Sequence, residues 1–230
     1  MELFRKILKR LPDSILVSMK KVYYFFLIRS GKFVSQEKEF SLLRMIIPEG
    51  AKVVDIGANV GHYTLLFSKL VGDKGRVLAF EPIPTTFNML VSNVHFSRSE
   101  NVTLINAAIS DASKEVNFTI PEENLYQSHM DDEGDIRVMC FPLMTFLPKD
   151  WDLGFLKIDA EGCDENIIRN SIDTLNAYRP IVMAELNSKK ANELISIFKD
   201  YCLKGVKGSH NKFFVPLEKL DSFPLQDSYE

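Results

Sequence analysis

Two glycines that follow a short apolar run place the strongest constraint on how this chain can fold. Residues 53–56 read Val-Val-Asp-Ile, which apart from Asp55 is typical of a strand buried on both faces of a sheet. Gly57 and Gly61 bracket the next turn, and apolar residues then recur at roughly helical spacing to Val71. Glycine is needed where the backbone takes a positive φ or where a ligand comes close. The stretch therefore predicts a strand, a tight turn and a helix at the ligand-binding end of an α/β sheet.

An acidic residue follows at a spacing that suits a nucleoside ligand. A second apolar run, residues 77–80, ends in Glu81, roughly 20 residues beyond the turn, where a carboxylate can meet two ribose hydroxyls. Asn59 replaces the middle glycine with which a dinucleotide fold opens its backbone amides to a pyrophosphate. S-adenosylmethionine has no phosphate, and its ammonium and sulfonium suit the acidic Asp55. The pattern therefore favours S-adenosylmethionine over a dinucleotide.

Four segments, taken in order, resemble one known family. They are residues 53–61 (Val-Val-Asp-Ile-Gly-Ala-Asn-Val-Gly), 80–82 (Phe-Glu-Pro), 106–111 (Asn-Ala-Ala-Ile-Ser-Asp) and 156–162 (Leu-Lys-Ile-Asp-Ala-Glu-Gly). Across about residues 49–185 the chain resembles the FkbM family of S-adenosylmethionine-dependent methyltransferases. The resemblance implies a Rossmann-like class I methyltransferase fold, an α/β fold whose mostly parallel seven-stranded sheet carries helices on both faces. It also implies methyl transfer, mostly to oxygen.

The rest of the pattern alternates between strands and helices. We expect strands at residues 52–56, 76–80, 102–105, 155–158, 181–184 and 213–215, and helices at 37–47, 61–71, 84–95 and 189–198. Two extra strands, 116–120 and 136–141, flank a polar loop at 121–135. A loop this long is uncommon inside a compact domain, so we interpret it as a lid or acceptor-binding loop, with a solvated insertion as the alternative.

Five carboxylates are expected on one rim of the sheet. Ligands of open α/β sheets bind beyond the carboxyl ends of the strands. Four acidic residues end predicted strands and one lies just beyond, in the set Asp55, Glu81, Asp159, Glu185 and Glu161. Crowded carboxylates raise one another's pKa unless cations or hydrogen bonds offset them. The two positive charges of S-adenosylmethionine would do so.

The cofactor half of the site draws on the first three resembling segments. Asp55 and the backbone of Gly57, Ala58 and Gly61 should face the methionine part, with Asn59 orienting the turn. Glu81, followed by Pro82, should hold the ribose hydroxyls. The adenine should lie between Asn106 and Ala107, with Ser110 and Asp111 at its edge.

The remaining acids, Asp159, Glu161 and Glu185, should face the acceptor. A hydroxyl needs a base within hydrogen-bond reach, or a metal that lowers its pKa. We predict metal-free catalysis with Asp159 or Glu161 as the base, and keep Mg²⁺ as the alternative because it prefers oxygen ligands. Lys157 could position an acceptor anion, and His129 is a second candidate base. Equally, Glu161 could only stabilise a helix N-terminus, and Glu185 could form a strand-end salt bridge.

Charge is divided unevenly along the chain. Residues 1–34 hold eight Lys and Arg against two acids, so the rest of the chain, whose overall net charge is −3, carries −9. An acidic main domain argues against nucleic acid as a partner. Asp-Ala-Glu-Gly at 159–162 also differs from the Asn/Asp-Pro-Pro-Tyr motif of enzymes that methylate nucleobases.

The basic segment defines a predicted N-terminal extension, residues 1–48, before a methyltransferase domain at 49–230. One amphipathic helix is expected before Pro12 and a second is expected to be capped by Ser14. The apolar run 22–28 is too short to span a bilayer, so the segment either lies on an anionic membrane surface or forms a helical cap that covers the cofactor or packs a homodimer. We favour the cap, because a small methyltransferase needs something to close the open end of its sheet.

The three cysteines are far apart and form no Cys-x-x-Cys pair, which predicts reduced thiols in the cytoplasm. No signal-peptide pattern opens the sequence, and peripheral attachment to a membrane is the alternative location.

Together these features predict an O-methyltransferase for a hydroxyl of a sugar, glycan or natural product. One alternative is a nucleotide-dependent oxidoreductase on a similar fold, which the turn sequence disfavours. The other is a non-catalytic membrane-surface scaffold with a degenerate methyltransferase domain, which the basic N-terminal segment suggests.

Overall fold

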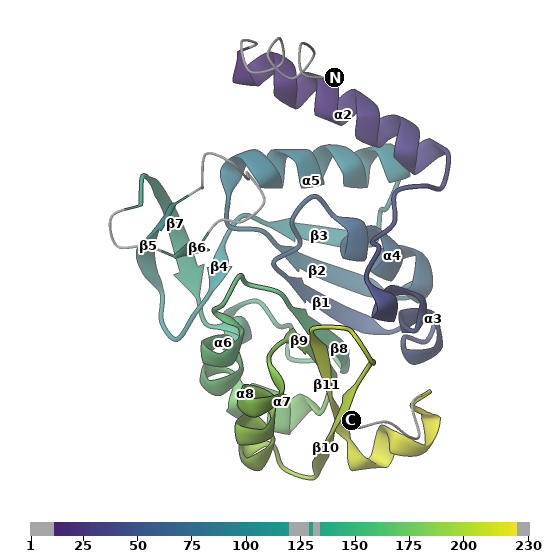
Figure 1. The fold of residues 1–230 in the computed structure, drawn as a ribbon, viewed down its shortest axis with the longest axis vertical. Helices are drawn as coiled ribbons and strands as arrows, with labels where there is room; N and C mark the ends of the chain where they lie inside the picture. Colours follow the sequence, from purple (N-terminus) through teal and green to yellow (C-terminus); the bar gives the residue numbers. More distant parts are fainter. Residues whose placement is uncertain (1–11, 120–128, 131–133, 225–230) are drawn as a thin grey trace.

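A seven-stranded sheet forms the centre of the molecule (Figure 1). The computed structural model describes residues 12–119, 129–130 and 134–224. The sheet contains β1 (Lys52–Ile56), β2 (Arg76–Phe80), β3 (Val102–Ile105), β8 (Leu153–Ile158), β9 (Ile181–Glu185), β10 (Tyr201–Gly205) and β11 (Asn211–Pro216). The strand order is β10-β11-β9-β8-β1-β2-β3, and β11 runs antiparallel to both of its neighbours. The parallel strands therefore all end at one rim, as predicted.

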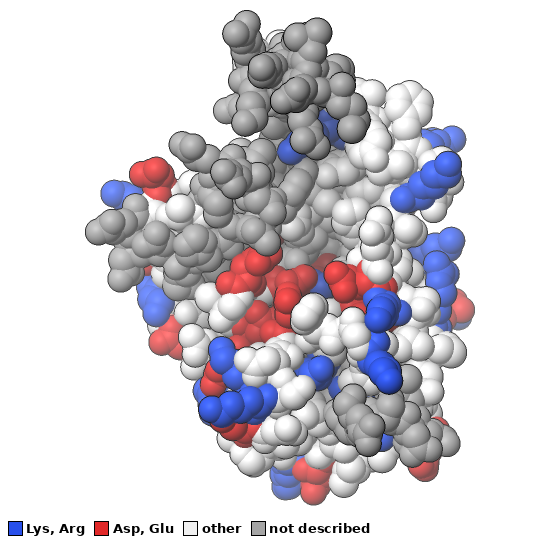
Figure 2. All heavy atoms as spheres, viewed as in Figure 1, with Lys and Arg blue, Asp and Glu red and all other residues white. Residues whose placement is uncertain are grey.

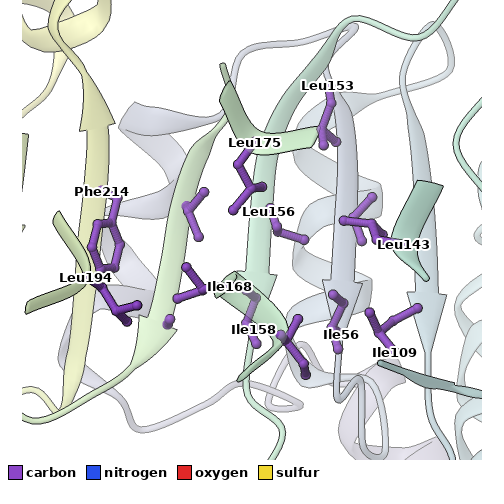
Figure 3. Packing of buried hydrophobic residues seen from close by; sticks show 14 of the residues in the cluster. Ile56, Ile109, Leu143, Leu153, Leu156, Ile158, Ile168, Leu175, Leu194 and Phe214 are labelled. Carbon is purple, nitrogen blue, oxygen red and sulfur yellow. The ribbon is translucent and has the colours of Figure 1, made fainter. Parts of the chain in front are cut away.

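Alternating side chains of the central strands build two cores, one on each face of the sheet. Val54 and Leu156 point into one core, whereas Val53 and Phe155, their neighbours in sequence, point into the other. Figure 3 shows the first of these cores, in which strand residues such as Leu156 meet Ile168 and Leu175 from the covering helices. Strands buried on both faces need such continuous apolar runs, and the sequence supplies them.

Helices cover both faces. On the face of the first core lie α6 (Asp164–Asn170), α7 (Ile172–Tyr178) and α8 (Ser188–Leu194), which is followed by η3 (Ile195–Ile197). On the other face lie α3 (Leu43–Ile46) and α4 (His62–Val71), while α5 (Pro84–Ser97) packs Leu90 and Val94 beside β2. Two short 3-10 helices, η2 (Leu143–Thr145) and η4 (Leu217–Ser222), also belong to the described residues.

A second, smaller sheet follows β3. It contains β4 (Ala108–Ile109), β5 (Lys114–Thr119), β6 (His129–Met130) and β7 (Ile136–Phe141), in the order β4-β7-β5-β6. The two predicted extra strands, β5 and β7, do pair with each other antiparallel. Most of the predicted lid, residues 120–128 and 131–133, lies outside the described residues.

At one end of the molecule α2 (Asp13–Arg29) lies along α5, on the side away from the sheet (Figure 1). The helix predicted before Pro12 lies outside the described residues. Ser14 does not cap α2, because the helix already begins at Asp13 with Pro12 as its N-cap residue. None of the helices that the structure describes is long and apolar enough to cross a membrane.

The predicted helix at 37–47 is wrong. The segment forms a 3-10 turn, η1 (Lys38–Ser41), and then the single turn α3. Its buried Glu39 accepts hydrogen bonds from the side chains of Tyr63, Ser209 and Asn211. These tertiary contacts hold the backbone in place of a continuous helix.

Candidate functional site

The glycine turn brings the ends of two neighbouring strands together. Gly57 has φ = 74°, and a Cβ at this position would overlap the carbonyl oxygen of Asp159, which follows β8. Gly61, with φ = 98°, is the N-cap residue of α4, and a Cβ there would lie 2.7 Å from Leu90 of α5. Both positions therefore require glycine, the first for the approach of β8 and the second for helix packing.

Two backbone hydrogen bonds hold the side chain of Glu81 beside this turn. Its Oε2 accepts a hydrogen bond from the backbone N–H of Asn59 (2.9 Å), and its Oε1 accepts one from that of Ile83 (2.9 Å). Burial raises the pKa of the Glu81 carboxyl to about 7, against the lowering effect of these two hydrogen bonds. Asn59 makes both turn contacts, through its backbone N–H to Glu81 and through a side-chain oxygen that accepts a hydrogen bond from the N–H of Val60.

A buried ammonium lies between two of the predicted carboxylates. The Lys157 Nζ is 3.1 Å from Oδ2 of Asp159 and 3.5 Å from Oδ1 of Asp55. Asp55 is fully buried and also accepts a hydrogen bond from the Thr64 hydroxyl (2.6 Å). Burial raises the pKa of the Asp55 carboxyl, although the nearby Lys157 ammonium acts to lower it. Burial alone would lower the pKa of Lys157, but the carboxylates of Asp159 and Asp55 outweigh that effect, so the pKa of Lys157 is raised.

These contacts correct two expectations. Asp55 does not line the ligand pocket, because its carboxylate points into the protein toward Thr64 and Lys157. Lys157 is 2% exposed and is held by Asp55 and Asp159, so it cannot position an acceptor anion. Asp55 and Lys157 are therefore buried structural residues that hold the strand ends behind the pocket.

Two adjoining pockets lie at the rim of the sheet. The first, of about 70 Å³, is lined by Ile56, Gly57, Asn59, Phe80, Glu81, Pro82, Thr86, Ala107, Ala108, Ile109, Phe118, Asp159, Ala160, Glu161, Cys163 and Ile167. The second, of about 300 Å³, is lined by Glu161, Gly162, Asp164, Glu185, Leu186, Asn187 and His210. Glu161 belongs to both. A whole cofactor needs several hundred Å³, so it would have to extend over the rim beyond the narrow first pocket.

The rim around the second pocket is acidic. Figure 2 shows acidic side chains gathered across the middle of this face. Desolvation, followed by repulsion from Asp159, raises the pKa of both Glu161 and Glu185. Burial also raises the pKa of Asp164, although its carboxylate accepts hydrogen bonds from the N–H groups of Ala160 and Glu185 (3.2 Å each). This rim is thus suited to a ligand that brings positive charge or hydroxyl donors.

Besides Asp55, four of the predicted cofactor contacts lie outside both pockets. The Asn106 amide donates to the carbonyl oxygens of Glu81 and Pro82, so it braces that turn and does not flank the pocket. Ser110 turns its hydroxyl to the carboxylate of Asp111, which also pairs with Lys114. Ala58 is buried, and Gly61 contacts α5. The remaining predicted cofactor contacts, namely Gly57, Asn59, Glu81, Pro82 and Ala107, do line the first pocket.

Three of the predicted catalytic residues line the pockets. Asp159 lines the first pocket, Glu185 lines the second, and Glu161 lines both. His129 belongs to β6, but its side chain lies outside the described part of the molecule. Within the described residues no group of three or more His, Cys, Asp and Glu is arranged to hold a metal ion.

Sequence reasoning missed the apolar wall of the first pocket. Phe118 comes from β5 of the second sheet, Ile109 from β4, and Cys163 precedes α6. Alternation of Val116 and Phe118 in the extra strand indicated one buried face, but nothing in the sequence indicated that this face turns toward the sheet rim. These side chains give the first pocket an apolar wall of the kind that ligand sites usually have.

We expect Gly57→Ala to lower the free energy of unfolding by about 2 kcal/mol or more, because the added methyl group meets both a backbone carbonyl and an unfavourable φ. The matched control is Gly162→Ala: it has φ = 93° but no atom within 4 Å, so it should cost only about 1 kcal/mol. Urea unfolding measures both. Equal losses for the two variants would contradict the proposed close approach of β8.

Glu81 should make stability fall as pH rises. Its folded pKa of about 7 lies above the ordinary 4.5, so between these values the folded state holds the proton that the unfolded state has released. The free energy of unfolding therefore declines from about pH 4.5 to 7, by at most about 3 kcal/mol from this group. Glu81→Gln should flatten this decline in urea unfolding from pH 4.5 to 8, whereas Glu193→Gln, at an exposed site, should not. Parallel curves for all three proteins would refute the assignment.

Comparisons with known proteins identify the family to which the sequence belongs. The family model described as the methyltransferase FkbM domain matches residues 55–202. Methyltransferase 1 of Beauveria bassiana is 26% identical, over 55% of this chain and 60% of its own length. A protein-L-isoaspartate O-methyltransferase of Methanothrix thermoacetophila is 35% identical over 25% of this chain and 27% of its own. The chain thus spans less than two thirds of the length of these curated relatives.

A solved structure shows the same fold. The crystal structure of methyltransferase FkbM from Methylobacillus flagellatus has a TM-score of 0.55 to this chain and 16% sequence identity, over 72% of this chain and 44% of its own. The predicted Rossmann-like class I methyltransferase fold is therefore confirmed. Since the family model covers well over half of the sequence, the chain belongs to the FkbM methyltransferase family.

Proposed function

We propose that this protein transfers a methyl group from S-adenosylmethionine to a hydroxyl of a sugar, glycan or natural-product acceptor. Family membership supports methyl transfer, and the rim supports a hydroxyl acceptor. The observation that carries the proposal is the position of Glu161, between the narrow first pocket, which contains Glu81 and an apolar wall, and the second pocket, which is rich in carboxylates.

The residues of the first pocket fit an adenosine. Glu81 is held by two backbone N–H groups, which leaves the other lone pairs of its carboxylate for the two ribose hydroxyls. Ile109, Phe118 and Ala107 supply apolar surface for the base. Asp159, which also lines this pocket, offers a carboxylate to positive charge at the methionine end.

The second pocket fits a polyhydroxyl acceptor. Carboxylates accept hydrogen bonds from hydroxyl groups, and Glu161, Asp164 and Glu185 lie together there. Glu161 takes φ = 46°, a left-handed conformation that is costly for any residue but glycine and that is often found at functional sites. We therefore assign Glu161, rather than Asp159, as the general base.

The roles of the two acids follow from their surroundings. Asp159 is paired with Lys157 at 3.1 Å, which keeps its charge in place as a fixed anion. Desolvation and the neighbouring acids raise the pKa of Glu161, and a base works best when its pKa approaches the working pH. In the proposed reaction Glu161 accepts the acceptor's hydroxyl proton while that oxygen attacks in line with the bond to the methyl group. The bound cofactor would supply that methyl group on a sulfonium, which leaves as a neutral thioether.

Thermal unfolding with ligands tests the cofactor. S-adenosylmethionine or S-adenosylhomocysteine at about 100 times its dissociation constant should add roughly 2.7 kcal/mol of stability, whereas NADH should add none. Glu81→Gln should weaken this protection and Glu193→Gln should keep it. Protection by NADH alone would support the oxidoreductase alternative, and no protection by either adenosyl compound would support the non-catalytic scaffold. Repeating each arm with EDTA and with Mg²⁺ tests whether a metal contributes.

Glu161→Gln should lower turnover about 10²-fold or more, because the amide cannot take the hydroxyl proton. S-adenosylhomocysteine should still protect this variant against thermal unfolding. Turnover is measured as S-adenosylhomocysteine formation with an acceptor found by screening sugars and glycans. Glu165→Gln, which removes a carboxylate from the first turn of α6, is the matched control and should remain close to wild type. Near-wild-type turnover of Glu161→Gln would exclude Glu161 as the base.

A further inference from the structure

The helix α2 is apolar on two opposite faces. One face packs Val17, Tyr24 and Leu27 toward a small core formed with Met89 of α5. The other face carries large side chains that are between 45% and 64% exposed: Ile15, Met19, Val22, Tyr23 and Phe26. Their spacing of three or four residues places them on one stripe of the helix. An exposed apolar stripe of this kind typically marks an interaction surface, so the outer face of α2 is a candidate for a partner.

This stripe is the main apolar exposure of the described residues. Of the twelve large hydrophobic side chains that are exposed there, six belong to α2, and the others are scattered over different elements. None of the residues 12–34 lines either pocket at the sheet rim. The predicted N-terminal helical cap thus corresponds to α2, which packs on α5 and leaves its own outer face exposed.

The charges around the stripe are positive. Residues 12–34 contain four basic residues and one acid, and α5 beneath them contains no Asp or Glu. Arg29 and Lys32 are exposed at the C-terminal end of α2. A shallow pocket of about 300 Å³ lies beside them, lined by Phe25, Arg29, His95, Phe96 and Arg98. Neither Arg29 nor Arg98 has an ion-pair partner within the described part of the chain.

We propose that α2 docks this protein on an anionic membrane surface. The stripe of Ile15, Met19, Val22, Tyr23 and Phe26 would enter the interface between headgroups and acyl chains, as apolar faces of interfacial helices do. Arg29 and Arg98 would bind lipid phosphate in the pocket beside Phe96. A second copy fits less well, because pairing two copies of the stripe would bring basic residues together without an acidic partner on α5.

The inference is independent of methyl transfer and can be tested without a cofactor or acceptor. The full chain is mixed with vesicles of phosphatidylcholine alone or of phosphatidylcholine with phosphatidylserine, and flotation is measured at low and high salt. We expect flotation with the anionic vesicles only, weakened by salt. Failure to float with anionic vesicles would overturn the proposal.

Substitutions at exposed positions separate this surface from the rest of the molecule. Val22→Glu with Phe26→Glu should weaken binding to anionic vesicles about tenfold or more. The matched control, Met45→Glu with Leu217→Glu, makes the same change at side chains that are 60% and 51% exposed elsewhere and should bind like wild type. Equal binding of both double variants would overturn the assignment to α2.

A charge-reversal pair tests the surface when the apolar variant unfolds. Circular dichroism and urea unfolding establish whether each variant is folded. Arg29→Glu with Arg98→Glu should lose binding to anionic vesicles, whereas Lys149→Glu with Lys189→Glu, at exposed sites elsewhere, should retain most of it. Sedimentation equilibrium tests whether the stripe instead binds a second copy of the chain. If the wild-type protein is a dimer that does not bind vesicles, and Val22→Glu with Phe26→Glu dissociates that dimer, the stripe is a dimer interface and the membrane proposal is refuted.

Discussion

The buried ammonium of Lys157 is the interaction on which the ligand end of the sheet depends. Lys157 and Asp55 are register partners on the neighbouring parallel strands β8 and β1, and Asp159 lies directly after the end of β8. A buried ion pair adds little net stability, because desolvation offsets the attraction, but losing one partner leaves a buried charge and costs several kcal/mol. The group therefore serves mainly to fix position. It holds Asp159 at the pocket wall next to the Gly57 turn, and the pocket takes its shape from that arrangement.

Much of this fold could be predicted from the sequence. The strands at 52–56, 76–80 and 102–105 are found with the predicted bounds, because short runs of β-branched and apolar residues that end at glycine, proline, asparagine or a charged residue are typical of buried strands. Gly57 and Glu81 also lie where their spacing placed them. The strand β10 was not predicted, because its sequence, Tyr-Cys-Leu-Lys-Gly, lacks a long apolar run. The strand lies at the edge of the sheet and pairs only with β11.

Side-chain direction was the harder problem. A residue at a strand end can face the ligand or the interior, and a single register step decides between them. Asp55 and Lys157 face inward toward each other, and Asn106 turns back to the carbonyls of Glu81 and Pro82. The sequence could place these residues at the rim but could not show which partners they satisfy. Phe118 illustrates the opposite case, because it reaches the pocket from another sheet.

The carboxylate of Glu39 connects distant parts of the chain. It accepts hydrogen bonds from Ser209 and Asn211, which lie 170 and 172 residues further along, and from Tyr63 at the start of α4. The cost of closing so long a loop must be met before these contacts form, and such non-local contacts slow folding. Because Glu39 is buried with all its partners, the segment before β1 and the β10–β11 hairpin are coupled. These two segments should therefore form together at a late stage: without the hairpin Glu39 would lose two of its donors, and without the segment before β1 Ser209 and Asn211 would lose their acceptor.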